Sequence, residues 1–265
     1  NLTFRNSNSN APVFYFSEGS QANILHYLII ESASNNIDNA AIKFGLGNNS
    51  RNTILNCQIG DIEGSASTPG QGILLSGAGN NEIEIKDNSF RNFGTAAIVL
   101  NGGCSNTLIE GNEIYMNKPS TIAGVYGIHL RNSKLTKVFR NNIHDLDGSY
   151  SVHGIYYEGS SGVISAQIIN NMIALSPTTA TILSGINYSG YASNNLTVYH
   201  NSVYLGGTLA SGPYDSYAFA KTGACDVLNV KNNIFVNGRV NNLGTGSHYS
   251  VCFNSIDGTD NFDYN

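Results

Sequence analysis

The side chains best suited to chemistry lie between positions 126 and 158 of the chain. They combine aromatic, imidazole, guanidinium and carboxylate groups: Tyr126, His129, Arg131, Asp145, Asp147, His153, Tyr156 and Glu158. Two carboxylates held close together act as acid and base in glycoside hydrolases. An enzyme acting on acidic polysaccharides needs a cation or carboxylate-bound Ca²⁺ to neutralise the uronate, and an Arg or Lys as base. An aromatic ring beside a cation and polar groups can instead bind a sugar without any reaction.

Three interpretations of these residues stay open. The first is a ligand-binding surface formed by Tyr126, His129, Arg131, His153, Tyr156 and Glu158. The second is a catalytic site formed by Arg131, Asp145, Asp147 and Glu158. In the third, the rings are ordinary solvent-facing residues and Arg131 forms only a weak surface ion pair with Glu158. Asp145 and Asp147 form the one D-x-D sequence of the chain, which is weak support for Ca²⁺, so we expect no cofactor.

The composition excludes several classes of protein. Charged residues make up 12% of 265 residues, and 13 Lys+Arg against 18 Asp+Glu leave a net charge of −5. This balance argues against a nucleic-acid partner, which needs a basic surface, and against a strongly charged groove for uronates. No run approaches the ~18 apolar residues of a membrane span, and no signal peptide opens the sequence. The 38 Asn and 29 Gly disfavour long helices.

Two short patterns recur along the chain. One is Asn, any residue, then an apolar residue, with its Asn at positions 88, 112, 141, 171, 201 and 232, and Cys57 in the same position of an earlier copy. The other is a small residue followed by apolar, any and apolar residues, as in Gly127-Ile-His-Leu130 and Gly154-Ile-Tyr-Tyr157. Each apolar stretch alternates over three to six residues, which is typical of short strands. Units of about 30 residues that cannot bury their own apolar face must stack on one another.

The repeat therefore predicts an all-β fold, a right-handed single-stranded parallel β-helix (β-solenoid) of about eight to nine coils. Residues 1–265 form one such domain. Both ends fall inside the repeat without an evident polar cap, so we expect a segment of a longer protein with neighbouring domains. Side chains such as Ile128 and Leu130 point inward, and His129 points outward.

The recurring asparagines have a structural interpretation. An Asn at one corner of every coil can hydrogen-bond the coils above and below, which satisfies polar groups that the corner would bury. We assign this role to Asn88, Asn112, Asn141, Asn171, Asn201 and Asn232. No two of the four cysteines share an offset in adjacent coils, so we expect free thiols, and without C-x-x-C pairs we expect no metal site. The other histidines (His26, His144, His200 and His248) lie at scattered offsets and are interpreted as strand or turn residues.

The chain resembles the right-handed parallel β-helix superfamily typified by pectate lyases. It is similar, more closely, to β-helix repeat segments of large secreted surface proteins of Bacteroidetes-type bacteria. The matching stretches are Leu196–Leu205, Val230–Asn237, Gly244–Val251 and Asp263–Asn265. The resemblance implies an extracellular or cell-surface location, often reached by type IX secretion. The chain departs from the enzymes of the superfamily, because it lacks the catalytic aspartate set of polygalacturonases and the multi-Asp calcium site of pectate lyases.

Stacking of coils also predicts how the candidate residues meet. His129 and Tyr156 should lie side by side on an outward row, with Arg131 and Glu158 two positions further along, while Asp145 and Asp147 follow a corner from which loops project. Our leading hypothesis is a non-catalytic extracellular β-solenoid that serves as surface adhesin, glycan-binding segment or spacer. The alternative is a polysaccharide lyase or glycoside hydrolase. The expected partner is a polysaccharide or cell-surface glycan, with no nucleic acid and no membrane insertion.

Overall fold

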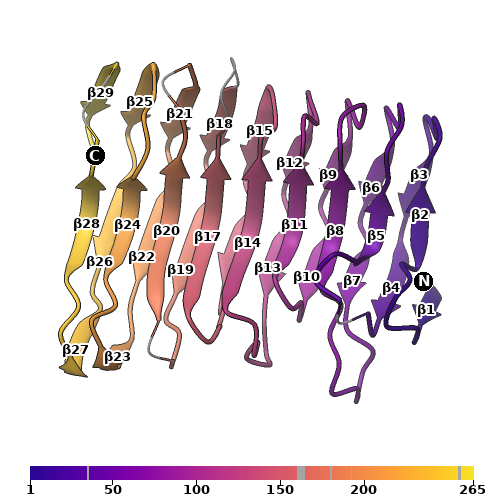
Figure 1. The fold of residues 1–265 in the computed structure, drawn as a ribbon, viewed down its shortest axis with the longest axis horizontal. Coiled ribbons are helices and arrows are strands. Elements are labelled where there is room, and N and C mark those ends of the chain that lie inside the picture. Colours follow the sequence, from indigo (N-terminus) through magenta and orange to yellow (C-terminus); the bar gives the residue numbers. More distant parts are fainter. Residues whose placement is uncertain (35, 160–164, 180, 192, 256–257) are drawn as a thin grey trace.

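The coils of the chain stack along one axis, with the N-terminus at one end and the C-terminus at the other (Figure 1). The computed structural model describes residues 1–34, 36–159, 165–179, 181–191, 193–255 and 258–265. Its described strands form three parallel sheets of nine strands each and a fourth sheet of two strands. Each coil contributes one strand to each large sheet in turn, so the predicted parallel β-helix of eight to nine coils is confirmed.

We name the large sheets A, B and C in the order in which the chain enters them. Sheet A contains β1 (Leu2–Asn6), β4 (Leu28–Ser32), β7 (Gln58–Gly60), β10 (Ser89–Arg91), β13 (Glu113–Tyr115), β16 (Asn142–His144), β19 (Met172–Leu175), β22 (Ser202–Leu205) and β26 (Ile234–Asn237). Sheet B contains β2 (Phe14–Phe16), β5 (Ala40–Phe44), β8 (Gln71–Ser76), β11 (Ala96–Asn101), β14 (Gly124–Arg131), β17 (Ser151–Glu158), β20 (Ile182–Ser189), β24 (Ser216–Lys221) and β28 (His248–Phe253). Sheet C contains β3 (Ile24–His26), β6 (Thr53–Leu55), β9 (Glu84–Lys86), β12 (Leu108–Glu110), β15 (Thr136–Phe139), β18 (Ser165–Ile169), β21 (Asn195–Tyr199), β25 (Val227–Lys231) and β29 (Thr259–Asp263). The two-stranded sheet pairs β23 (Thr208–Gly212) with β27 (Val240–Gly244).

The core is a set of stacked apolar rows inside the coils. In sheet B, one row places the isoleucines at 73, 98, 128, 155 and 186 in register, and all five are fully buried. Each buried side chain packs on its copies in neighbouring coils, which is how units too small for a core of their own become stable. The described residues include no helix long and apolar enough to cross a membrane.

Hydrogen-bonded asparagines line the corner between sheet C and sheet A. The column consists of Asn88, Asn112, Asn141, Asn171, Asn201, Asn233 and Asn265. In the first six, the side-chain amide donates to Oδ1 of the next asparagine over 2.8–3.0 Å. The same Oδ1 also accepts the backbone N–H of the preceding column residue, and Cys57 N donates to Asn88 Oδ1 in this way at 2.9 Å. The column therefore satisfies backbone groups that are buried at this corner.

The assignment of Asn232 to this column is wrong, because Asn233 occupies the position. Asn201 donates to Asn233 Oδ1 at 2.9 Å, whereas Asn232 has a backbone φ of 55°. The residue before the column has a positive φ in the other coils too, including Asn170 (59°) and His200 (56°). Asn232 therefore makes the left-handed turn into the corner, a conformation that asparagine tolerates better than most residues.

The four cysteines are free thiols in the structure. Cys57, Cys104 and Cys225 are buried, and Cys252 is half-buried. Burial raises the pKa of the Cys104 thiol to about 12, so this group stays protonated and unreactive at neutral pH.

Candidate functional site

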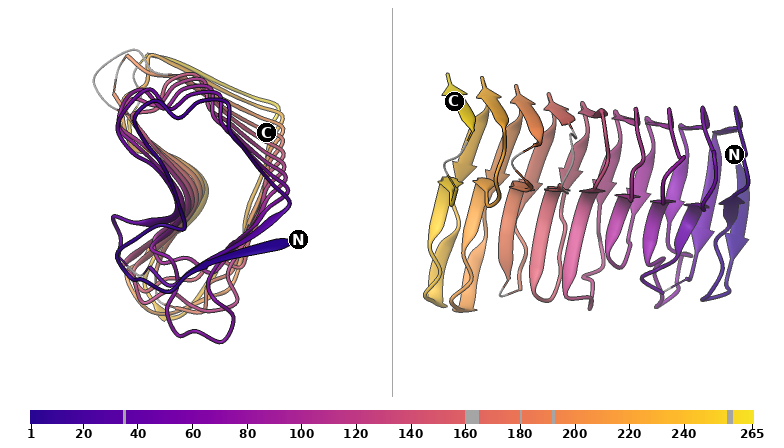
Figure 2. Two further views of the ribbon diagram at one scale, coloured as in Figure 1. Left: turned by 90° about the vertical axis from the view of Figure 1, so that its right-hand side faces the viewer. Right: turned by 45° about the horizontal axis from the view of Figure 1, so that its top comes forward.

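Sheet B curves towards the inside of the coils, so its outer face is concave (Figure 2). Most of the candidate residues lie together on this face. Strand alternation is interrupted at Gly127 and Gly154, so that Tyr126 and His153 face outward together with His129. A Cβ on Gly127 would lie 2.8 Å from an Ile143 methyl carbon of sheet A and 2.6 Å from the Gly154 carbonyl oxygen. Glycine is therefore required where the strand bends against the opposite sheet.

Four rings from two adjacent strands form a compact aromatic cluster on this face. Tyr126 stacks on His129 with ring centroids 4.4 Å apart, and on His153 at 5.0 Å. Tyr156 completes the cluster at 5.2 Å from His129 and 5.1 Å from His153. The predicted pairing of His129 with Tyr156 and of Arg131 with Glu158 matches the strand register. We name these four rings, with Arg131 and Glu158, the sheet B cluster.

Two hydrogen bonds to one carboxylate join the charged members of this cluster. Glu158 Oε2 lies 3.2 Å from His129 Nε2 and 3.0 Å from Arg131 Nε. The bond from His129, together with Arg131, lowers the pKa of Glu158. Burial lowers the pKa of His129, so the ring is neutral at pH 7. Because a carboxylate only accepts hydrogen bonds, Nε2 is the ring nitrogen that bears the proton.

His153 is held as a neutral, buried member of the same cluster. It is 7% exposed, and its Nδ1 makes a hydrogen bond to Ser184 Oγ on the next strand. Burial lowers the pKa of His153 to about 3. This ring therefore supports the positions of Tyr126 and Tyr156, whose rings are half-exposed and more accessible to a ligand.

Asp145 and Asp147 line a different hollow, at the corner between sheets A and B, together with Lys118 and Thr178. Asp147 accepts hydrogen bonds from Thr178 Oγ1 at 3.1 Å and from Thr179 Oγ1 at 2.9 Å. Asp145 Oδ2 lies 2.7 Å from His144 Nδ1. No hydrogen bond or ion pair between described residues joins either aspartate to Arg131 or Glu158.

The structure extends the sheet B cluster with residues that the sequence did not single out. A hollow of about 340 Å³ beside Tyr126 and His129 has an apolar floor that includes Leu74 and Val99. The other side chains that line it are mostly polar: Asp38, Lys43, Gln71, Ser76, Thr95, Asn101 and Arg131. Leu74 and Val99 share the outward row of His129, and this register is the signal that could have identified them.

A comparison with protein families agrees with this architecture. The family model described as "right handed beta helix region" matches residues 1–203. Two solved structures of PfbA, a surface adhesin of Streptococcus pneumoniae, are similar to this chain. One is 11% identical and covers 88% of this chain and 82% of the other chain, with a TM-score of 0.23. The other is 12% identical, covers 90% and 91%, and has a TM-score of 0.24. No curated protein matches the sequence.

Proposed function

We propose that this chain, which belongs to the right-handed β-helix family, is a non-catalytic extracellular β-solenoid that binds a glycan on the concave face of sheet B. The observation that supports this proposal is the sheet B cluster, in which half-exposed tyrosine rings adjoin the hydrogen-bonded Arg131–Glu158 pair. Flat apolar rings can cover one face of a sugar, and the pair can hydrogen-bond its hydroxyl groups.

The hollow beside the cluster favours a chain-like ligand over a small compact one. Its lining residues come from successive strands, β5, β8, β11 and β14, which follow one another along the axis. Adjacent strands lie about 4.8 Å apart. A polysaccharide that lies along this face would meet a repeated set of apolar floor and polar rim groups, so contacts that are individually weak would add up.

The charge state of the cluster favours binding over catalysis. A general acid needs a raised pKa, whereas the bonds from His129 and Arg131 lower that of Glu158. The guanidinium of Arg131 is already paired with Glu158 at 3.0 Å, so it does not present a free base or a free counter-charge for a uronate. A lyase or glycoside hydrolase, the alternative function, would also need a second group nearby, and Asp145 and Asp147 lie in another hollow.

Binding and turnover should be measured together on a panel of soluble polysaccharides. The purified chain is tested against pectin, alginate, xylan and mannan, with retention in affinity electrophoresis as the binding signal. Reducing ends and the absorbance of unsaturated uronates report cleavage. We expect retention by at least one glycan without turnover.

The variant Tyr156→Ala removes one half-exposed ring. It should weaken retention by about three- to tenfold, the value of one aromatic contact. Tyr204→Ala is the matched control, because Tyr204 is a 50% exposed tyrosine on sheet A. Turnover that Arg131→Ala or Glu158→Ala abolishes would establish the enzyme instead. Failure to bind any glycan would leave the spacer role.

A further inference from the structure

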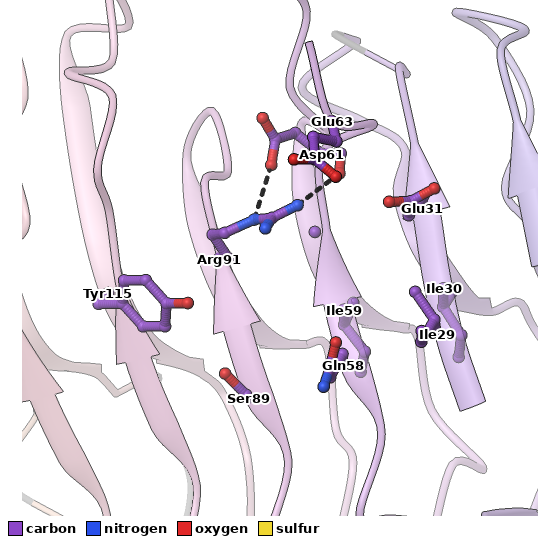
Figure 3. Close-up of a pocket in the computed structure, with 11 residues that line it drawn as sticks. Ile29, Ile30, Glu31, Gln58, Ile59, Asp61, Glu63, Ser89, Arg91 and Tyr115 are labelled. Atoms are coloured by element: carbon purple, nitrogen blue, oxygen red, sulfur yellow. Dashed lines mark hydrogen bonds and ion pairs between the residues drawn. The ribbon is translucent and has the colours of Figure 1, made fainter. Parts of the chain in front are cut away.

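A third hollow lies on the outer face of sheet A, away from the sheet B cluster. It has a volume of about 280 Å³ and is bordered by side chains from β4, β7, β10 and β13 and from the segment after β7 (Figure 3). We propose that this hollow binds a single uncharged sugar ring, such as the terminal residue of a glycan. The side chains on which this depends are Glu31, Gln58, Asp61, Glu63, Arg91 and Tyr115.

One wall of the hollow is fixed by a buried carboxylate. Asp61 is 1% exposed, and its Oδ1 accepts hydrogen bonds at 3.1 Å from both Arg91 Nε and Asn92 Nδ2. Its Oδ2 pairs with Lys118 Nζ, and its backbone carbonyl accepts from Arg91 Nη2 at 3.3 Å. These bonds hold the Arg91 guanidinium across the hollow, as Figure 3 shows. Such fixed polar groups bind a ligand without a further ordering cost.

The opposite wall presents a second carboxylate with one oxygen free. Glu31 Oε2 accepts both bonds from Arg5, with Nε at 2.8 Å, and no hydrogen bond between described residues uses Oε1. At the rim, Glu63 is exposed, and the described residues provide it with no ion pair. The hollow thus offers acceptors that the protein itself does not satisfy.

Donors and an aromatic ring complete the lining. Arg91 Nη1 donates to no described residue, and neither the amide of Gln58 nor the hydroxyl of Tyr115 has a hydrogen-bond partner among them. The Tyr115 ring is held by stacking on His144, with centroids 5.5 Å apart and planes 2° from parallel. In Figure 3 its hydroxyl points toward the hollow.

This mixture of groups selects one class of ligand. Adjacent sugar hydroxyls each donate and accept, so they suit a hollow in which free carboxylate oxygens face free amide and guanidinium N–H groups. Arg5 pairs with Glu31, and Arg91 and Lys118 pair with Asp61, so the hollow has no surplus cation for an acidic sugar, while the unpaired carboxylate of Glu63 disfavours one by like-charge repulsion. Among the described residues, no three His, Cys, Asp or Glu side chains form a group that could hold a metal ion. A volume near the lower end of ligand pockets, about 300 Å³, suits one ring.

The test uses four monosaccharide probes: the methyl α-glycosides of glucose, galactose and mannose, and glucuronate. Saturation-transfer NMR with the whole chain measures the affinity for each probe. We expect at least one methyl glycoside to bind, and to bind more tightly than glucuronate. Glu31→Gln combined with Glu63→Gln should lower the affinity for this glycoside about tenfold or more, because two hydrogen bonds lose a charged acceptor. Glu82→Gln is the control, because Glu82 is exposed and lies outside the hollow.

Tyr115→Ala is a second variant. It leaves the ion pairs in place and should also lower the affinity for the glycoside. The proposal is overturned if no glycoside binds, if glucuronate binds most tightly, or if neither the double variant nor Tyr115→Ala weakens binding. This site does not depend on the function proposed for sheet B. Tyr156→Ala should leave methyl glycoside binding here unchanged, and the double variant should leave polysaccharide retention by sheet B unchanged, so failure of one proposal is distinguishable from failure of the other.

Discussion

Replacement of Asn171 by Ala should destabilise the solenoid far more than an ordinary surface substitution. Asn171 is 2% exposed, and its Oδ1 accepts the backbone N–H and the Nδ2 of Asn141, both at 2.9 Å. Its own Nδ2 donates to the Val138 carbonyl and to Asn201 Oδ1, also at 2.9 Å. Alanine leaves the backbone N–H of Asn141 and the carbonyl of Val138 without these partners. Each orphaned buried group costs about 1–3 kcal/mol, so we expect a loss of about 3–5 kcal/mol.

The assay is equilibrium unfolding in urea, followed by the circular dichroism of the strands. Asn142→Ala is the matched control: Asn142 is the next residue in the chain after the column residue Asn141, it points outward, and its side chain has no hydrogen bond to another described residue. Asn171→Asp tests the acceptor and the donor of the amide separately. It keeps an acceptor for Asn141 but places a carboxylate against the Val138 carbonyl. We expect Asn171→Asp to be destabilised at pH 7 as well. A loss below about 1 kcal/mol for Asn171→Ala, no greater than that of the control, would refute the reasoning.

Three further predictions concern buried titratable groups. Burial lowers the pKa of His153 from 6.5 to about 3. As the pH falls, the unfolded chain therefore binds a proton at this ring before the folded chain does, and stability is lost between pH 6.5 and 3. At about 1.4 kcal/mol per pH unit, the loss in the free energy of unfolding is on the order of 4–5 kcal/mol. His153→Gln should therefore flatten the pH profile of urea unfolding between pH 6.5 and 4. The control His200→Asn, at an exposed site, should leave the profile unchanged. Lys221 is fully buried, and its Nζ donates to both carboxylate oxygens of Asp260 at 2.8 and 2.9 Å. Lys221→Met should therefore destabilise the folded chain by about 3–5 kcal/mol, measured by calorimetry. Adding Asp260→Asn should recover most of that loss. In the folded chain, an alkylating reagent should modify Cys252 well before the three buried cysteines, and mass spectrometry showing equal rates would contradict the burial.

The repeat made much of this molecule predictable. Every coil repeats one local arrangement, so the spacing of the apolar and asparagine positions predicts the parallel sheets and the inward row that includes Ile128. The same periodicity predicts the pairing of His129 with Tyr156. It could not choose between Asn232 and Asn233, because each has an apolar residue two positions later, Ile234 and Phe235. In the structure Ile234 is 61% exposed while Phe235 packs against the core, which identifies Asn233 as the counterpart of Asn201.

The candidate site was predictable only where it lies on regular strands. Asp145 and Asp147 follow β16 at a corner, and their separation from the sheet B cluster depends on how that corner packs on Thr178 and Thr179 of the next coil. Corners vary in length from coil to coil, so sequence spacing gives no register there.

The fold, the direction in which strand side chains point, and the row on which the central rings lie could all be inferred from the amino-acid sequence. These follow from a local pattern that each coil repeats on its neighbour. The positions of the hollows and the charges that they contain depend instead on how distant parts of the chain pack. The hollow on sheet A needs Glu31, Asp61, Arg91 and Tyr115 from four successive coils, and the Lys118 that fixes Asp61 lies 57 residues away in the chain. Glu31, Arg91 and Tyr115 share one row of sheet A through strand register, but Asp61, Glu63 and Lys118 lie in the irregular segments after the strands, and no short motif predicts how those segments pack on one another.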